Sequence, residues 1–428
     1  MRRTLAILIF AILAIVAFVP LLVGPSVQRE IEAAQAPLGS SLGIPLELES
    51  YERGWFRARA VACTIVPLAG WGTEPTCVDY HIQHGPLLLA QPAGIGWFGI
   101  RMTPRLPSAA ADALRNVAGD ATPVVVTMRA GLSGRTRIVA ESAAARGALG
   151  DATIDAAEAR WEASYHPTTR QLEGLIDAPH LQIEGPLLRF DLRRLEGEIV
   201  AEEATGGWWL GTATASLEKF LVASDTVDDI QVRGARVLYR AARERDERID
   251  LTWTLDVDQL LSAATSSGAA GGLSLALSNV RAVPVDTLPQ PWAPGSSVDL
   301  RTSILALRGT LEPLLRDGGG VDLERLQLRL GEDSLEGRLR IDVGPPGDEP
   351  SLQALAQRVS ADGELLISRT LAERALGRTA VEQWLGTGLA TARDSALYVA
   401  IDLADGKLAV GEKEFPLVLL LAMLSLAK

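Results

Sequence analysis

The chain has 428 residues, of which 47% are hydrophobic and 22% are charged, and its formal net charge is −12. This composition is too apolar for a disordered protein and is ample for a large packed core. The negative charge excludes nucleic acid as an electrostatically favoured partner.

The N-terminus is an uncharged, mostly apolar run that follows Arg2 and Arg3. The run from Leu5 to Gly24, at about 1.5 Å per residue, is long enough to cross a bilayer core of roughly 30 Å. The alternative is a cleaved signal peptide, whose apolar region is normally shorter. We therefore predict a transmembrane anchor in residues 1–26, with the N-terminus in the cytoplasm and the body in the periplasm of a bacterium. The predicted membrane-spanning residues are Leu5, Ala6, Ile7, Leu8, Ile9, Phe10, Leu13, Ile15, Val16, Phe18, Leu21 and Leu22.

Strand patterns dominate after a short predicted helical stalk at residues 27–36. Apolar and polar residues alternate in PLELES and in CVDYHIQ, and a period of two indicates a sheet with one solvated face. Between residues 122 and 301 the same alternation recurs, punctuated by turn residues, which favours antiparallel meanders. The predicted strands there are 122–129, 135–140, 152–166, 171–176, 180–184, 188–202, 209–222, 228–240, 248–257, 272–282 and 297–301.

The two cysteines, Cys63 and Cys77, flank a segment rich in proline and glycine. In an oxidising compartment a disulfide that closes this turn is favoured, and two separate buried thiols are the alternative. No cluster of Cys, His and carboxylate residues has metal-ligand spacing. We therefore predict no metal and no other cofactor.

The segment ESYERGWFRARA gathers Tyr51, Trp55 and Phe56 around Gly54. One interpretation is a fold corner, in which Gly54 supplies an unusual backbone angle and the aromatic side chains pack over it. A second is contact with the headgroup zone of a membrane, which suits Trp, Tyr and Arg. A ligand site is the third. The sequence His84-Gly85-Pro86 is typical of a strand interrupted by a bend.

Period 3.6 predicts helices at 107–117, 303–316 and 351–360, and over 364–392 with breaks at Gly377, Gly386 and Gly388. Residues 321–344 form the clearest predicted hairpin, and Asp405-Gly406 predicts a type I′ turn in a second one. The apolar segment 416–427 is too short to span a bilayer. It is expected to be buried or to contact a membrane surface.

Signals for catalysis are missing from the sequence. The four histidines, His81, His84, His166 and His180, lack metal-type spacing, and neither GxSxG nor HExxH occurs. We therefore predict that the protein is not an enzyme.

The N-terminal apolar run, Tyr51, Gly54, Trp55 and Phe56, followed about thirty residues later by His84-Gly85-Pro86, together resemble the YdgA-like family of bacterial envelope proteins of unknown function. The ending DGKLAVGEKEFPL resembles the family's closing strand-Gly-strand. Specific motifs cover residues 1–100 and 395–417, and the middle is similar only in character. The chain departs from the pattern between Cys63 and Cys77, and at Gly411-Glu412-Lys413 where the family has Asn-Gly.

The resemblance implies an inner-membrane protein with a periplasmic, β-rich body and no established reaction. More remotely, the architecture is similar to AsmA-like envelope proteins, in which an anchored, curved sheet offers an apolar groove for lipids. That step is an analogy at the level of the fold.

We predict an α+β fold in which one N-terminal transmembrane helix precedes a mainly antiparallel, curved β-sheet body with a few helices. Residues 27–120 would form an N-terminal β segment with the aromatic corner, 121–302 the sheet body, and 303–428 its C-terminal helix and hairpin region. The predicted function is to bind or convey phospholipid or other amphiphiles in envelope maintenance. The alternative is an assembly or scaffold factor that binds envelope proteins at a sheet edge. The candidate apolar groove consists of Leu326, Leu328, Leu330, Leu335, Leu339 and Ile341.

Overall fold

The computed structural model describes residues 23–29, 47–64, 75–119, 122–149, 151–186, 188–204, 208–224, 227–244, 248–262, 265–281, 317–345 and 352–418. The chain forms two compact units. Unit 1 comprises Met1–Ile199 and Val222–Asp225, and unit 2 comprises Val200–Leu221 and Thr226–Lys428. Strands β13 (Leu188–Glu203) and β14 (Trp209–Ser224) lie where this division falls.

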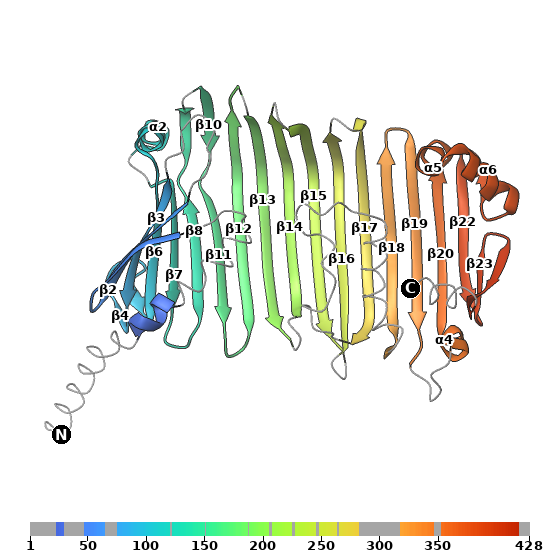
Figure 1. The fold of residues 1–428 in the computed structure, drawn as a ribbon, viewed down its shortest axis with the longest axis horizontal. Coiled ribbons are helices and arrows are strands. Elements are labelled where there is room, and N and C mark those ends of the chain that lie inside the picture. Colours follow the sequence, from blue (N-terminus) through green and yellow to red (C-terminus); the bar gives the residue numbers. More distant parts are fainter. Residues whose placement is uncertain are drawn as a thin grey trace, which may run out of the picture. The chain divides into compact units, whose positions relative to one another are not determined.

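Unit 1 is an antiparallel sheet built mostly from consecutive strands (Figure 1). Its strands are β1 (Glu47–Arg53), β2 (Arg57–Thr64), β3 (Thr76–His84), β6 (Phe98–Arg105), β7 (Val124–Ala130), β8 (Thr136–Ser142), β9 (Ala145–Leu149), β10 (Ala152–Ala156), β11 (Ala159–His166) and β12 (Gln171–Glu184). A separate two-residue pair, β4 (Leu87–Leu88) and β5 (Gly94–Ile95), lies between β3 and β6. Helix α2 (Ser108–Ala118) joins β6 to β7.

The core of unit 1 forms where small and large apolar residues alternate across three strands. Ala58 lies opposite Ile82, which in turn lies opposite Ile100, and all three side chains are buried. Val27, in the helical segment 23–29, packs into the same cluster. Because the alanine side chains on β2 are small, segment 23–29 can pack close to the sheet.

Gly85 is needed where the chain leaves β3. A Cβ atom at this position would lie 1.5 Å from the carbonyl oxygen of Gly96, a distance that no side chain can occupy. The Gly85 N–H donates to the oxygen of Trp97 at 2.6 Å, and the Gly96 N–H donates to the oxygen of Pro86 at 3.0 Å. These two hydrogen bonds hold the start and the end of the loop between β3 and β6 together.

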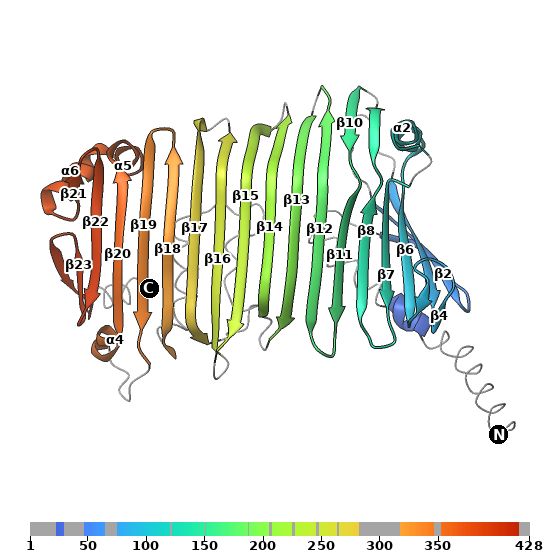
Figure 2. The ribbon, with the colours of Figure 1, turned by 180° about the vertical axis from the view of Figure 1, so that it is seen from behind.

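Unit 2 consists mainly of long antiparallel strands that lie side by side in both views (Figures 1 and 2). They are β15 (Val227–Arg243), β16 (Arg248–Ser262), β17 (Thr265–Arg281), β18 (Gly319–Leu330), β19 (Asp333–Val343), β20 (Val359–Ser368), β21 (Thr391–Arg393), β22 (Ala396–Ala404), β23 (Lys407–Val410) and β24 (Lys413–Pro416). Its helices are α4 (Leu352–Arg358), α5 (Arg369–Leu376) and α6 (Arg378–Thr387). Buried clusters form around Val343, Val359 and Leu403, and around Ala372, Val381 and Leu397.

Several elements match the sequence patterns, including α2, the β18–β19 hairpin, and the turn at Asp405 and Gly406, where both residues have positive φ. The predicted helix over 364–392 is wrong at its start, because residues 359–368 form β20, and it then divides at Gly377 into α5 and α6. The predicted strand 152–166 is divided into β10 and β11. The predicted strands 171–176 and 180–184 are parts of a single strand, β12. The predicted elements 297–301 and 303–316 lie outside the described residues.

The predicted α+β class with a transmembrane helix requires correction. Antiparallel strands dominate the described part of the chain, and none of its helices is both long enough and apolar enough to cross a membrane. Most of the predicted span, including Leu5 to Leu22, lies outside the described residues. The single-pass inner-membrane location is therefore not supported and is withdrawn.

The C-terminal end of the N-terminal apolar run shows why hydropathy is not enough to predict a membrane span. Val23 and Val27 pack against the sheet of unit 1, so that apolar residues there contribute to a protein core. Hydropathy alone does not distinguish a side chain buried in protein from one buried in lipid.

Replacing Ile82 by alanine is expected to lower the free energy of unfolding by about 2–5 kcal/mol, because Ile82 is 1% exposed and its removal leaves a cavity. The matched control is Ile95→Ala, whose side chain is 61% exposed and should change stability by less than about 0.5 kcal/mol. Urea denaturation followed by circular dichroism measures both. Equal effects of the two substitutions would contradict the assigned core.

Candidate functional site

One face of unit 2 is apolar across six neighbouring strands, from β15 to β20. Directly paired residues point to the same side of a sheet, and every second residue along a strand shares that side. The register therefore aligns apolar side chains in rows that cross the strands. The three central rows are Val237, Leu255, Leu273, Leu326, Gly337 and Leu365; Tyr239, Trp253, Leu275, Leu323, Leu339 and Gly363; and Ala241, Leu251, Leu277, Val321, Ile341 and Ala361.

A bulge in β18 keeps its leucines on this face. Leu323 lies opposite Leu339, whereas Leu326 lies opposite Gly337. One extra residue is thus inserted in β18 between these two pairs. Without it, Leu326 and the two alternate leucines that follow would point to the other side of the sheet.

The apolar face is covered less completely than a core. Most residues of its three central rows are half-buried, and Ala241 and Gly363 at the ends of two rows are buried. The core clusters found among the described residues include no residue of β15, β16, β17 or β18. The described helix α5 packs on β19, β20 and β22, and α4 packs on β20. A broad apolar surface of this kind is suited to contact with apolar chains.

The opposite face of the same strands is polar. Arg325 pairs with Asp256, and Arg338 donates to Glu364 at 2.9 Å. This hydrogen bond is the main reason that the pKa of Glu364 lies below its ordinary value. An open hollow of about 330 Å³ on this face is lined by Arg325, Arg338, Glu364, Arg393 and Tyr398 among others. The two faces therefore offer different chemistry, ionic on one side and apolar on the other.

The structure places all six residues of the predicted groove on the apolar face. Leu328 lies opposite Leu335. Leu339 and Ile341 instead lie opposite Leu323 and Val321, because the bulge shifts the register. Residues of β15, β16 and β17 extend the apolar face beyond the predicted groove. The alternations LTWTL and LSLAL were the signal, but pairing between distant strands could not be deduced from them.

The residues of the aromatic motif come together at one end of the unit 1 sheet, but they divide into two groups. Tyr51 packs against the core cluster, whereas Trp55 and Phe56 are about half exposed. The His84 N–H donates to the oxygen of Phe56 at 2.9 Å and so ties the two segments together.

His84 is the most deeply buried ionisable side chain of this corner, with 1% of its surface exposed. Neither ring nitrogen has a hydrogen bond of ordinary geometry within the described residues. Burial lowers its pKa below the ordinary value, and the nearby Arg53 acts in the same direction, while the Trp55 backbone acts against both. A Cβ atom at Gly24 would lie 3.1 Å from the His84 ring, so segment 23–29 closes over this side chain.

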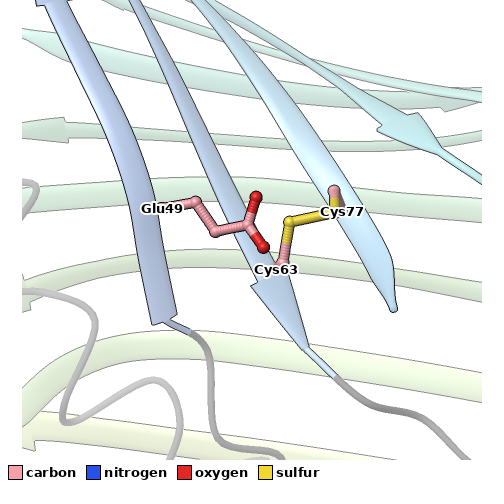
Figure 3. A group of neighbouring side chains, drawn as sticks. All are labelled: Glu49, Cys63 and Cys77. Atoms are coloured by element: carbon pink, nitrogen blue, oxygen red, sulfur yellow. A yellow bond between two sulfur atoms is a disulfide. The ribbon is translucent and has the colours of Figure 1, made fainter. Parts of the chain in front are cut away.

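Cys63 and Cys77 form a disulfide between directly paired residues of β2 and β3, with Cα atoms 4.0 Å apart. The Glu49 carboxylate lies beside the two sulfur atoms (Figure 3). These three residues are the one group in the described part of the chain with metal-ligand proximity. Because the sulfur atoms are bonded to each other, they are not thiolates, and the group is a poor metal site.

A protein-family model described as "Bacterial protein of unknown function (DUF945)" matches residues 1–418. No curated protein and no solved structure gives a significant match. The family description carries no activity.

Replacing both Cys63 and Cys77 by alanine is expected to lower stability by about 3 kcal/mol, because the bond closes a loop of about 15 residues. Thermal unfolding of the oxidised protein, the reduced protein and the double variant measures this effect. Reduction should lower the stability of the native protein and leave the variant unchanged. Full thiol labelling of the native protein without reductant would contradict the bond.

Stability should also depend on the protonation of His84. Since burial lowers the pKa of His84 in the folded state, the unfolded state binds the proton more tightly. The contribution of His84 is complete above about pH 6.5 and is lost as the pH falls toward the folded-state pKa, at up to about 1.4 kcal/mol per pH unit. Denaturation at pH 7.5 and 5.5 should show a smaller loss for His84→Leu than for the native protein. His81→Gln, an exposed position on the same strand, is the control, and an unchanged loss in His84→Leu would contradict the assignment.

Proposed function

We propose that this chain, which belongs to the bacterial protein family of unknown function DUF945, is a non-catalytic protein that binds the apolar part of lipids or other amphiphiles. The observation that carries the proposal is the set of apolar rows that cross β15 to β20 on one face of unit 2. Their half-buried side chains form a surface on which an acyl chain would lie against leucine, valine and tryptophan side chains.

The energetics favour a ligand with a long apolar chain. Each methylene group removed from water contributes about 0.8 kcal/mol. Eight methylene groups would therefore contribute roughly 6 kcal/mol before the cost of ordering the chain is subtracted. Such binding requires area and shape rather than convergent polar groups, and the apolar face has that character.

The disulfide supports a location in an oxidising compartment, such as the periplasm or the exterior of the cell. Lipids are available to a protein in the bacterial envelope. The finer resemblance, to YdgA-like proteins and more remotely to AsmA-like proteins, forms part of this proposal. By analogy at the level of the fold, this resemblance supports the proposal, because AsmA-like proteins offer an apolar groove for lipids on a curved sheet.

Binding of an envelope protein at a sheet edge is the second candidate. Within the described residues, β1 pairs only with β2, so one edge of this seven-residue strand has no partner strand. Its sequence, ELESYER, carries four charged side chains. Charge on an edge strand disfavours the addition of another strand, so the apolar face is the stronger basis for a function.

The test measures lipid that remains with the full-length protein after purification, using native mass spectrometry and lipid extraction. Leu275→Asn and Leu323→Asn place amides in the central row and should lower amphiphile affinity roughly tenfold each. The matched control is Leu238→Asn, because Leu238 lies opposite Thr254 on the polar face. Circular dichroism establishes that each variant is folded.

Trp253 provides a local reporter within the same row. Subtracting the emission spectrum of Trp253→Phe from that of the native protein isolates the fluorescence of Trp253. This emission should shift to shorter wavelengths when a lysophospholipid is added. An unchanged difference spectrum, together with a native protein that carries no lipid, would overturn the proposal. Equal loss of lipid from Leu238→Asn and Leu275→Asn would overturn the assignment to this face.

A further inference from the structure

Four connections of unit 1 meet at one end of its sheet. They are residues 54–56, 85–97, 131–135 and 167–170, which join β1 to β2, β3 to β6, β7 to β8 and β11 to β12. The register places them together, because Arg57 pairs with Gln83, Phe98 with Ala130, and Thr136 with Tyr165. We call this set of connections the loop end; it lies at the lower ends of β2, β6, β7 and β8 in Figure 1.

The loop end exposes large apolar side chains. Leu89 is 82% exposed, and Ile95, Trp55 and Leu87 are each about half exposed or more. Contacts within two of the connections, and one between 85–97 and 131–135, hold these side chains in place. Leu87 pairs with Ile95, the Trp97 indole N–H donates to the oxygen of Leu132 at 3.2 Å, and the rings of Trp55 and Phe56 lie 6.3 Å apart. An exposed apolar set of this kind indicates an interaction surface.

The loop end, together with the strand residues that adjoin it, carries a charge opposite in sign to that of the whole chain. The segments 53–57, 84–97, 129–135 and 167–170 contain five arginines and no carboxylate, although the chain carries a net charge of −12. The arginines are Arg53, Arg57, Arg129, Arg135 and Arg170. Arg135 is paired with Glu173 on β12, and Glu52 is next to Arg53, which leaves a smaller local excess of positive charge.

An arginine-lined hollow of about 280 Å³ lies next to the loop end, on the solvated side of β2, β3 and β6. Arg59, His81 and Arg101 form one row across these strands, and Arg57 lies in the adjacent row. Glu52 is the register neighbour of Arg59 on β1. Within the described residues neither Arg57 nor Arg59 makes an ion pair, so the hollow holds guanidinium groups that a bound anion could neutralise.

The rim of this hollow is held in place by amide groups. Gln83 donates to the oxygen of Ala90 and accepts from the Ala90 N–H, each at 2.8 Å. Arg101 donates to the side-chain oxygen of Gln91 at 2.7 Å. These bonds fix the loop that carries the exposed apolar side chains beside the arginines. The exposed apolar side chains and the arginines are therefore held in fixed positions relative to one another.

We propose that the loop end docks on the surface of an anionic phospholipid bilayer, with the arginine-lined hollow taking a headgroup phosphate. Tryptophan, phenylalanine and leucine side chains suit the boundary between headgroups and acyl chains. Guanidinium groups match the geometry and charge of a phosphate. A soluble acidic protein would be attracted by the arginines, but it would leave the neighbouring apolar loop without a complementary surface.

This docking rests only on described residues of unit 1 and is independent of the amphiphile proposal for unit 2. Its test uses the full-length protein and two kinds of vesicle, one of phosphatidylcholine alone and one with 30% phosphatidylglycerol. Because residues 1–22 are identical in every variant, their contribution to the ratio of the two affinities cancels when the variants are compared with the native protein. The native protein should prefer the anionic vesicles, and the preference should fall as salt is raised.

The double variant Arg59→Gln, Arg101→Gln should lose about 25-fold in that preference, since each arginine near an anionic surface contributes about fivefold. Leu89→Ser should weaken binding to both kinds of vesicle. The matched controls are Arg329→Gln and Leu175→Ser, exposed residues of the same types away from the loop end, and they should bind like the native protein. Thermal unfolding establishes that all variants are folded.

Inorganic phosphate, titrated without vesicles, distinguishes a free anion from a headgroup. Binding of phosphate that is lost in the arginine variant, with no preference between the vesicles, would overturn the docking and assign the hollow to a free anion. Equal vesicle binding by the native protein and by both loop-end variants would also overturn it. Loss of the anionic preference in the arginine variant alone, with both controls unchanged, supports it.

Discussion

The pairing of antiparallel strands is the constraint on which the rest of the structure depends. Once two strands are in register, opposite residues share a face, and a slip of one residue would invert every side chain. In unit 2 this rule holds across six strands and produces an apolar face backed by ion pairs. The bulge in β18 shows how strictly the rule is kept, because one inserted residue returns Leu326 to the apolar side.

The same rule gives unit 1 a different chemistry. Ala58 and Ile82 point to the core side, while Arg57 and Arg59 on the same strand point to solvent. The small alanines allow segment 23–29 to approach the sheet and close over His84. A buried histidine without ordinary hydrogen bonds breaks the usual rule that buried polar groups are satisfied. Such local departures are expected where a structure serves more than packing.

Two surfaces follow from these arrangements, and they suit different parts of a lipid. The apolar face of unit 2 has the character that acyl chains require, and the loop end of unit 1 combines cationic and apolar side chains as a bilayer surface requires. The two surfaces share no residue, since one lies on unit 2 and the other on unit 1. Both use residues that an ordinary core would not need, such as the exposed Leu89 and the half-buried row that contains Trp253.

The sequence by itself determined the antiparallel strands, the β18–β19 hairpin and the turn at Asp405-Gly406, because alternation and turn preferences are properties of neighbouring residues. It misassigned residues 364–368 as helix, since the pairing of β20 with β19 and β22 overrides local preference. Only the tertiary structure decided that Leu275 and Leu323 share a row, that Arg59 and Arg101 share a hollow, and that Val27 packs on the sheet. Those contacts join residues far apart in the chain, and their register is set by long-range pairing that no local pattern encodes.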